Sequence, residues 1–346
     1  MSKDEIYMHR CIQLALLGQG NVAPNPMVGA VLVHNDIIIG EGYHALYGKE
    51  HAEVACINSV LPHNHHLIKE ATLYVSLEPC AHYGKTPPCA DHIVQKKIKK
   101  VVIGCIDTFA AVAGKGIQKL KSAGIEVVIG ILDKECKELN KRFFTFHKNK
   151  RPYIVLKWAQ SGNGKIGGEG NERILISNEF SNRLVHKWRS EEAAILVGTN
   201  TARLDDPSLT TRLWPGTNPV RLVLDRGLAL PDSLKIFNSE AKSIVFNEVK
   251  NEIKDNISYH KLNKEDKVLP QILNALYNIN IQSVLVEGGR QLLQSFIDEE
   301  AWDEVRIITN EHLMIPAGTN VPSLNNQKLF HTENLKGDTI HYYQKN

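Results

Sequence analysis

One histidine and two cysteines, widely spaced along the chain, constrain its fold more than any other feature of the sequence. They are His51, Cys80 and Cys89, and Glu53 follows the histidine by two positions. One imidazole and two thiols can bind Zn²⁺ and leave its fourth tetrahedral position for water, which distinguishes a catalytic zinc site from a closed structural one. The carboxylate of Glu53 is placed to move protons to and from that water. The fold must therefore bring together segments that are far apart in the sequence.

Two other interpretations of these residues are open. A closed structural zinc site needs a fourth ligand, and His82 is the one candidate at short spacing. A disulfide between Cys80 and Cys89 needs an oxidising compartment, and six cysteines in 346 residues are too few for a disulfide framework. Residues 1–5 lead straight into an amphipathic helix without a secretory hydrophobic region, so we expect a cytoplasmic protein with reduced thiols.

The charge and hydropathy of the chain exclude some classes of partner. The net charge is only +3, without the basic patch that is typical of nucleic-acid-binding proteins. No apolar run approaches the roughly 20 residues that a membrane-spanning helix needs. We therefore expect a small-molecule substrate and neither a nucleic acid nor a membrane as partner. A homo-oligomer is compatible with the sequence.

Strands and helices are expected to alternate in the first half of the chain. The apolar runs 27–34 and 37–42 flank Asn35 and Asp36, a pair typical of a tight hairpin turn. Further strands are expected at 71–77, 101–106 and 126–129, and helices at 3–20, 51–60, from about 89, at 115–122 and at 133–147. This alternation predicts an α/β domain with a largely parallel sheet after the first hairpin.

A second α/β domain is expected to begin near Arg151, after a basic and polar stretch. Because 346 residues suit two domains better than one, we divide the chain into 1–149 and 150–346. In the second domain, strands are expected at 153–159, 193–198, 220–225, 243–247, 283–287, 304–309 and 339–343, and helices at 178–190, 266–278 and 290–300.

Two glycine-containing segments of the second domain are candidates for a phosphate site. Residues 162–167 fit the pattern G-x-G-x-x-G, but a dinucleotide fingerprint requires a helix to begin there, and none is expected. We interpret 162–170 as a mobile loop beside a site. Residues 287–289, Glu-Gly-Gly, instead join a predicted strand to a predicted helix, where backbone N–H groups can meet a phosphate. The glycines are also compatible with a plain strand-to-helix turn.

The first domain resembles the zinc-dependent base deaminases, whose signature is H-x-E followed by P-C-x-x-C. In this chain the second half is stretched to Pro79-Cys80 and Cys89, and this spacing resembles that of the bifunctional deaminase-reductases of riboflavin biosynthesis. The motifs that carry the resemblance are Pro24-Asn25-Pro26-x-Val28-Gly29, Gly40-Glu41-Gly42-Tyr43-His44, His51-Ala52-Glu53-Val54, Glu78-Pro79-Cys80-Ala81-His82-x-Gly84-x-Thr86-Pro87-Pro88-Cys89 and Gly114-x-Gly116.

The resemblance implies a cytidine-deaminase-like three-layer domain that uses Zn²⁺ to deaminate a diaminopyrimidine carrying a ribosylamino 5'-phosphate. Glu53 would be its catalytic acid and base, with His51, Cys80 and Cys89 as the metal ligands. By analogy Asn25, His44 and His82 would contact the substrate, and each is equally compatible with a structural role in a turn or in the core.

The second domain resembles the family's reductase domain, which is similar in fold to dihydrofolate reductase and uses NADPH. The resemblance lies in Lys157-Trp158-Ala159-x-Ser161, Val197-Gly198-x-x-Thr201 and onward to Arg212, Val220-Arg221-x-Val223-Leu224-Asp225, and Glu287-Gly288-Gly289. It implies that hydride from NADPH reduces the ribosyl group of the deaminated product to a ribityl chain. By position, NADPH would contact Ala159, Leu175, Thr201, Asp205, and Gly289 with the helix start up to residue 295. The substrate would contact Lys157, Arg189, Leu209, Arg212 and Glu287.

The roles of individual reductase residues have alternatives. Arg189 and Arg212 suit the substrate phosphate because guanidinium groups match phosphate oxygens, but surface salt bridges would also account for either one. The family often has Trp where this chain has Leu175, and Asp where it has Asn163. We therefore expect weaker NADPH binding than in a Trp-bearing relative, and a change in the ordering of the 162–170 loop.

Two further functions are compatible with the residues. One is a monofunctional nucleoside or RNA base deaminase whose C-terminal half is a binding module. The other is a zinc-stabilised scaffold without catalysis, in which Glu53 would be dispensable.

Overall fold

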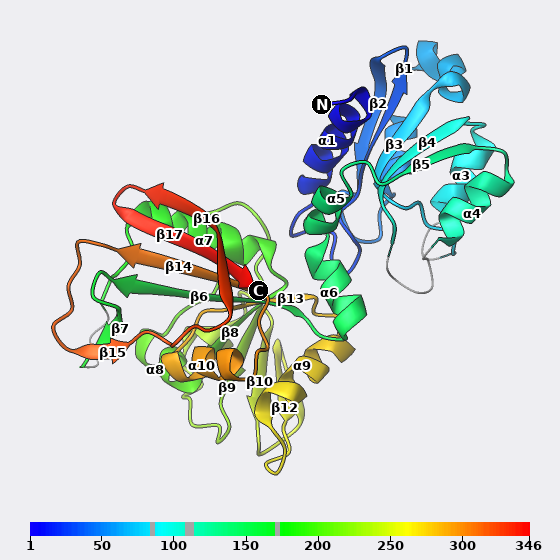
Figure 1. Cartoon of the computed structure of the whole chain (residues 1–346). Helices are drawn as coiled ribbons and strands as arrows, with labels where there is room; N and C mark the ends of the chain where they lie inside the picture. The colour runs from blue at the N-terminus through cyan, green and yellow to red at the C-terminus, as the bar shows by residue number, and fades with distance from the viewer. Residues whose placement is uncertain (84–86, 108–113, 170–173) are drawn as a thin grey trace. The chain divides into compact units, whose positions relative to one another are not determined.

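The computed structural model describes residues 1–83, 87–107, 114–169 and 174–346, and the chain divides into two compact units, Met1–Lys150 and Arg151–Asn346 (Figure 1). Gly84 and Thr86 of the family motif, and the last residue of the expected 162–170 loop, lie outside the described residues. Within the described ranges, no helix is both long and apolar enough to cross a bilayer.

The first unit contains a five-stranded sheet in the order β2-β1-β3-β4-β5. Its strands are β1 (Gly29–His34), β2 (Ile37–Tyr43), β3 (Thr72–Leu77), β4 (Lys100–Cys105) and β5 (Glu126–Ile129). Asn35 and Asp36 have φ values of 47° and 63°, as a tight turn between two antiparallel strands requires. Because β3, β4 and β5 pair in parallel, the predicted hairpin followed by a parallel sheet is confirmed.

Helices cover both faces of this sheet. They are α1 (Lys3–Leu16), α2 (Ala52–Asn58), α3 (Cys89–Gln95), α4 (Lys115–Ser122), α5 (Asp133–Leu139) and α6 (Lys141–Asn149), with a 3₁₀ helix at Pro62–Glu70. Successive strand residues point to opposite faces, so Leu32 of β1 belongs to the core under α2, α3 and α4, whereas Val31 belongs to the core under α1 and α5. The predicted three-layer α/β architecture is confirmed.

The helix expected at 133–147 is interrupted at Asn140, which separates α5 from α6. The buried Asn140 side chain accepts a 2.8 Å hydrogen bond from the backbone N–H of Met27 and donates a 2.8 Å bond to its carbonyl. This tertiary pairing competes with helix continuation, because Asn readily forms hydrogen bonds to backbone outside helices.

The second unit contains a ten-stranded sheet in the order β11-β12-β10-β9-β8-β13-β6-β14-β17-β16. Its strands are β6 (Tyr153–Ser161), β8 (Ala194–Gly198), β9 (Val220–Leu224), β10 (Ser243–Asn247), β11 (Glu252–Lys254), β12 (Ile257–Lys261), β13 (Ser283–Val286), β14 (Glu304–Asn310), β16 (Gln327–Leu335) and β17 (Asp338–Lys345). The seven strands from β12 to β14 in this order are parallel, and β11, β17 and β16 are antiparallel to their neighbours.

The helices of the second unit are α7 (Glu179–Glu191), α8 (Thr199–Asp205), α9 (Val268–Asn278) and α10 (Arg290–Asp298), with a short 3₁₀ helix at Lys235–Phe237. α8 follows β8 directly and α10 follows β13 directly, so both helices begin at the carboxyl edge of the parallel strands. In open α/β sheets this edge is where ligands bind.

Residues 162–169 differ from the mobile loop that we expected over 162–170. Residues Lys165–Gly168 form strand β7, which pairs antiparallel with β15 (Gly318–Asn320). Asn163 connects the same two segments: its side chain donates to the carbonyl of Ile315 at 2.9 Å and accepts from the Ile315 N–H at 3.1 Å. The second half of the G-x-G-x-x-G sequence lies in this strand, so this segment is not a dinucleotide-binding helix start.

Candidate active sites

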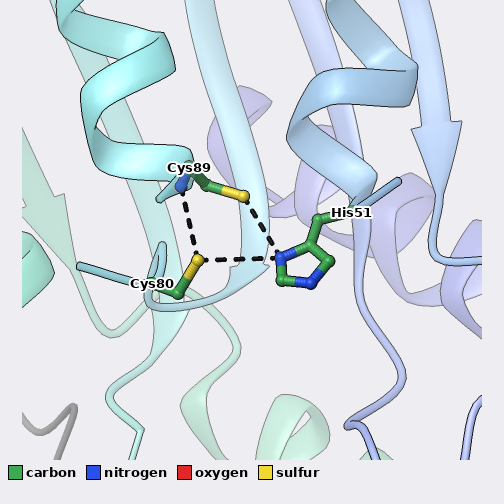
Figure 2. A group of neighbouring side chains, drawn as sticks. All are labelled: His51, Cys80 and Cys89. Atoms are coloured by element: carbon green, nitrogen blue, oxygen red, sulfur yellow. Dashed lines mark hydrogen bonds between the residues drawn. The ribbon is translucent and has the colours of Figure 1, made fainter. Parts of the chain in front are cut away.

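The three predicted metal ligands of the first unit meet at one point, and each comes from the end of a different element (Figure 2). His51 immediately precedes α2, Cys80 follows β3, and Cys89 is the first residue of α3. The His51 Nδ1 atom lies 3.6 Å from the Cys80 Sγ atom and 3.3 Å from the Cys89 Sγ atom. The backbone N–H of Cys89 also donates to the Cys80 sulfur at 3.3 Å.

The spacing of these atoms fits a zinc ion. Tetrahedral Zn²⁺ with typical Zn–N and Zn–S bond lengths holds a nitrogen and a sulfur ligand about 3.6 Å apart. The ligand atoms all lie within 4.8 Å of one another, and among the described residues no fourth His, Cys, Asp or Glu joins the cluster. His82 is exposed and outside it, so the donor set is that of an open site rather than a closed structural one.

Both cysteines are free thiols in the structure, and their proton affinities differ. A hydrogen bond from the Cys89 thiol, together with the His51 ring, lowers the pKa of Cys80 far below that of an ordinary thiol, although burial opposes the shift. The same hydrogen bond raises the pKa of Cys89. The Cys80 thiolate is therefore favoured already in the metal-free protein, and thiolate is the form that binds metals.

Glu53 lies in the first turn of α2, and only 3% of the residue is exposed. Burial raises the pKa of its carboxyl group, and the neighbouring Cys80 raises it further. A carboxyl group with a raised pKa beside an open metal position has the properties of a general acid and base.

Of the three residues expected to contact the substrate in the first unit, Asn25 and His44 lie beside His51, whereas His82 is exposed and outside the metal cluster. His44 is buried, with its ring edge-on to that of His51 at 5.3 Å between centroids. Its Nδ1 atom lies 2.9 Å from the Glu50 carbonyl and its Nε2 atom 3.1 Å from the Asn25 amide nitrogen. A neutral ring that donates through Nδ1 and accepts through Nε2 satisfies both contacts, and burial lowers the pKa of His44 in agreement with that state. Asn25 and His44 thus form a pair beside His51.

Sequence reasoning missed Glu78 in this unit. The residue is 4% exposed, and its carboxylate accepts hydrogen bonds from the backbone of Asp107, Gly114, Gly116 and Ile117. An acidic residue directly before Pro79-Cys80, within a predicted buried strand end, was the available signal.

Most of the site residues predicted in the second unit line a cleft of about 1350 Å³. It is bordered by β6, β7, α7, α8, α10 and the segments between them. The expected site residues among its lining are Lys157, Ala159, Leu175, Arg189, Thr201, Asp205, Leu209, Glu287 and Gly289. Arg212 does not line the cleft.

A buried group of charges lies against this cleft. Glu287 forms a two-pronged ion pair with Arg189, with both N–O distances at 2.8 Å, and the Lys157 Nζ atom lies 3.8 Å from the same carboxylate. The side chains are 8%, 11% and 12% exposed, so the surface salt bridge considered for Arg189 is in fact an internal one. Burial raises the pKa of Glu287, but the charges of Arg189 and Lys157 outweigh burial and lower it to about 2.

Side chains of helix α7 form hydrogen bonds to the segment that contains Leu209 and Arg212. The ring of His186, a residue that sequence reasoning missed, accepts the backbone N–H of Arg212 at 3.0 Å through Nδ1. Arg212 bonds to the Thr210 hydroxyl at 3.0 Å. Burial and the nearby arginines lower the pKa of His186 to about 4, so the ring is neutral at pH 7. Leu209 is buried with a left-handed backbone, φ 52°.

The turn between β13 and α10 requires both of its glycines. A Cβ atom on Gly288 would come within 2.9 Å of the Val197 side chain on β8. Gly289 has φ +72°, and a Cβ atom there would lie 3.2 Å from the Thr201 hydroxyl. The helix start therefore approaches α8 closely, and bare backbone faces the cleft where a phosphate could bind.

Leu175 is 77% exposed at the cleft. Most of its apolar surface faces solvent in the ligand-free protein, so a flat ring of a bound ligand could pack against it.

Comparisons with known proteins agree with this arrangement. Residues 1–105 match the cytidine and deoxycytidylate deaminase zinc-binding region, and residues 152–327 match the RibD C-terminal domain. The chain is 40% identical to the riboflavin biosynthesis protein RibD of Aquifex aeolicus, covering 90% of this chain and 88% of that protein. It is 39% identical to RibD of Bacillus amyloliquefaciens, covering 93% and 87%.

Solved structures are similar over the same extent. A Thermotoga maritima protein described as a diaminohydroxyphosphoribosylaminopyrimidine deaminase/5-amino-6-(5-phosphoribosylamino)uracil reductase matches with a TM-score of 0.92 and 36% identity, covering 99% of both chains. Acinetobacter baumannii RibD matches with a TM-score of 0.90 and 31% identity, again over 99% of both chains.

Proposed function

The chain belongs to the RibD family of riboflavin biosynthesis proteins, and from this premise we propose that residues 1–149 carry the family's deaminase and residues 150–346 its reductase. It is a bifunctional enzyme with Zn²⁺ and NADPH as cofactors. A monofunctional nucleoside or RNA base deaminase is not favoured, because the second half matches a RibD domain over residues 152–327.

In the deaminase, His51, Cys80 and Cys89 would hold the metal, which supplies a water activated for attack on the pyrimidine ring. Glu53 would take the proton that the water loses and pass it to the ring nitrogen. It would then take the second proton, from the hydroxyl now on the attacked ring carbon, and give it to the amino group, which leaves as ammonia. The raised pKa of Glu53 supports this role, because such a carboxyl group accepts and returns protons closer to neutral pH. The pair formed by Asn25 and His44 orients the substrate, and His82 contacts it from an exposed position.

In the reductase, NADPH supplies the hydride that reduces the ribosyl group to ribityl. Ala159, Leu175, Thr201, Asp205 and Gly289 would hold the cofactor along the cleft.

On the substrate side of the cleft, Lys157, Arg189, Leu209 and Glu287 would contact the substrate. Two N–H groups of Arg189 donate hydrogen bonds to Glu287, so Arg189 would contact the substrate as part of an ion pair. Arg212 bonds to the Thr210 hydroxyl and does not line the cleft, so its contact with the substrate phosphate requires its segment to move when the substrate binds.

The observation that carries the proposal is the convergence of one imidazole nitrogen and two sulfurs next to a buried glutamate. The test offers the purified protein the phosphoribosylated diaminopyrimidine with and without NADPH, and follows ammonia release and the absorbance of reduced nicotinamide. Ammonia should appear without NADPH, and NADPH should be consumed only when deamination has occurred. Ammonia without any NADPH consumption would remove the reductase assignment.

A variant separates catalysis from a zinc-stabilised scaffold. Glu53→Gln should keep its zinc and lose ammonia release, and the deaminated product supplied from outside should restore NADPH oxidation. Glu126→Gln, which removes an exposed carboxylate paired with Lys100 on the same unit, is the matched control and should keep both activities. Deamination at the normal rate by Glu53→Gln would contradict the assignment.

The proposal includes a small-molecule substrate rather than a nucleic acid, in keeping with the net charge of +3. It also includes a cytoplasmic location, because the described structure holds all six cysteines as free thiols and the metal site needs two of them reduced.

A further inference from the structure

Glu78 is a buried acid that the deaminase chemistry does not use. Its side chain points away from solvent at the end of β3, two residues before Cys80, and the residue is 4% exposed. Removing an ionised carboxylate from water is costly unless hydrogen bonds replace its hydration, so this carboxylate must be held by specific donors.

Among the described residues, four backbone N–H groups supply those donors. The Oε2 atom accepts from Asp107 at 3.3 Å and from Gly114 at 3.0 Å. The Oε1 atom accepts from Gly116 at 3.0 Å and from Ile117 at 3.3 Å. Glu78 therefore ties the segment that carries Cys80 to the end of β4 and to the first turn of α4.

A close backbone contact adds to this attachment. A Cβ atom on Gly116 would lie 1.9 Å from the carbonyl oxygen of Pro79, so α4 begins in direct contact with the residue before Cys80. On the other side, the Cys80 carbonyl accepts the N–H of Ala90 at 3.1 Å. Within the part of the chain that the structure describes, Cys80 is bonded to α3 through its carbonyl and its sulfur, and it is connected to α4 through Glu78 and Pro79.

We propose that Glu78 is a positioning residue that holds Cys80 in the orientation required for metal binding. The proposal rests on the zinc deaminase function proposed above. Glu78 acts through the backbone and contacts neither metal nor substrate. Groups that orient metal ligands in this way contribute roughly 10–100-fold to metal affinity.

The arrangement requires a carboxylate, which makes the proposal specific. Each oxygen of Glu78 faces two N–H donors. A glutamine would replace one oxygen with an NH₂ group, which cannot accept and would meet two donors head-on. Glu78→Gln is therefore a disruptive change here, although it conserves shape.

The test compares zinc affinity in the full-length chain for wild type, Glu78→Gln, Gly116→Ala and Lys115→Ala. Zinc is removed, and each protein then competes for zinc with a chromophoric chelator. Far-ultraviolet circular dichroism of the metal-free proteins reports whether the first unit is folded. Gly116→Ala displaces Pro79 while Glu78 stays intact, and Lys115→Ala changes an exposed neighbour at the same helix start as a control.

Glu78→Gln and Gly116→Ala should each fold and bind zinc about tenfold or more weakly than wild type, whereas Lys115→Ala should bind within about twofold. Two folded variants with wild-type zinc affinity would overturn the proposal. Loss of the fold of the first unit in both variants would also overturn it, because the role would then be global stability. Absence of zinc binding in the wild type would instead refute the proposed function itself.

Discussion

Replacing Glu287 by glutamine should destabilise the second unit by about 3 kcal/mol at neutral pH. Burial raises the pKa of this carboxyl group, but Arg189 and Lys157 lower it from 4.5 to about 2. Each pKa unit corresponds to about 1.4 kcal/mol of preference for the ionised form. The value agrees with the roughly 3–5 kcal/mol lost when one partner of a buried ion pair is removed.

The pH dependence of the difference in unfolding free energy between wild type and Glu287→Gln is a sharper test than the size of that difference. The pKa of Glu287 is lower in the folded than in the unfolded chain, so its stabilisation is present above about pH 4.5 and is lost as the pH falls toward 2. The glutamine variant has no such group. The gap in unfolding free energy between wild type and Glu287→Gln should be constant from pH 7 to 5, and should narrow by about 1.4 kcal/mol for each pH unit below 4.5.

Tryptophan fluorescence during urea unfolding measures this gap in one unit alone. All four tryptophans lie in the second unit, at positions 158, 188, 214 and 302. Glu300→Gln, which removes an exposed carboxylate paired with Lys345, is the matched control and should change the unfolding free energy by less than about 1 kcal/mol. A Glu287→Gln variant as stable as wild type at pH 7, or a gap that stays constant down to pH 3.5, would refute the reasoning.

Three other changes have definite expected outcomes. Leu175→Trp should bind NADPH more tightly, measured by calorimetric titration, because an aromatic face would cover the nicotinamide; unchanged affinity would mean that this exposed position does not touch the cofactor. Asn163→Asp should lower the unfolding free energy of the second unit by about 1–2 kcal/mol, since a carboxylate cannot donate to the Ile315 carbonyl, and a urea titration that shows no loss would contradict the pairing. Chelation of zinc should lower the melting temperature of the first unit by circular dichroism and leave the tryptophan transition of the second unit unchanged; a shift of that transition would argue against separate folding.

The sequence predicts an element well where the residue types at that position are compatible with one local conformation. Asn35 and Asp36 predict the hairpin because few other residues adopt positive φ at both turn positions. The zinc ligands are predictable for a different reason. Metal coordination needs particular residue types at one point, so His51, Cys80 and Cys89 imply their own proximity however distant they are along the chain.

Features that depend on contacts between distant segments were not predictable. Strand β7 is short and glycine-rich, and it exists because β15, far along the chain, pairs with it. The sequence assigned Arg189 and Glu287 separately to the substrate, but nothing in it indicated that they bind each other. Asn140 ends a helix through the backbone of Met27, which no local pattern reveals.

Leu209, which lines the cleft, has a left-handed backbone conformation that is unfavourable for a leucine. A left-handed conformation costs a leucine roughly 1 kcal/mol that glycine would avoid, yet this position carries a branched apolar side chain, buried and in contact with the cleft. The wall therefore keeps a buried apolar side chain at this position although its backbone is strained. Substitution by glycine would relax the backbone and remove this side chain from the wall, at a position that we propose contacts the substrate.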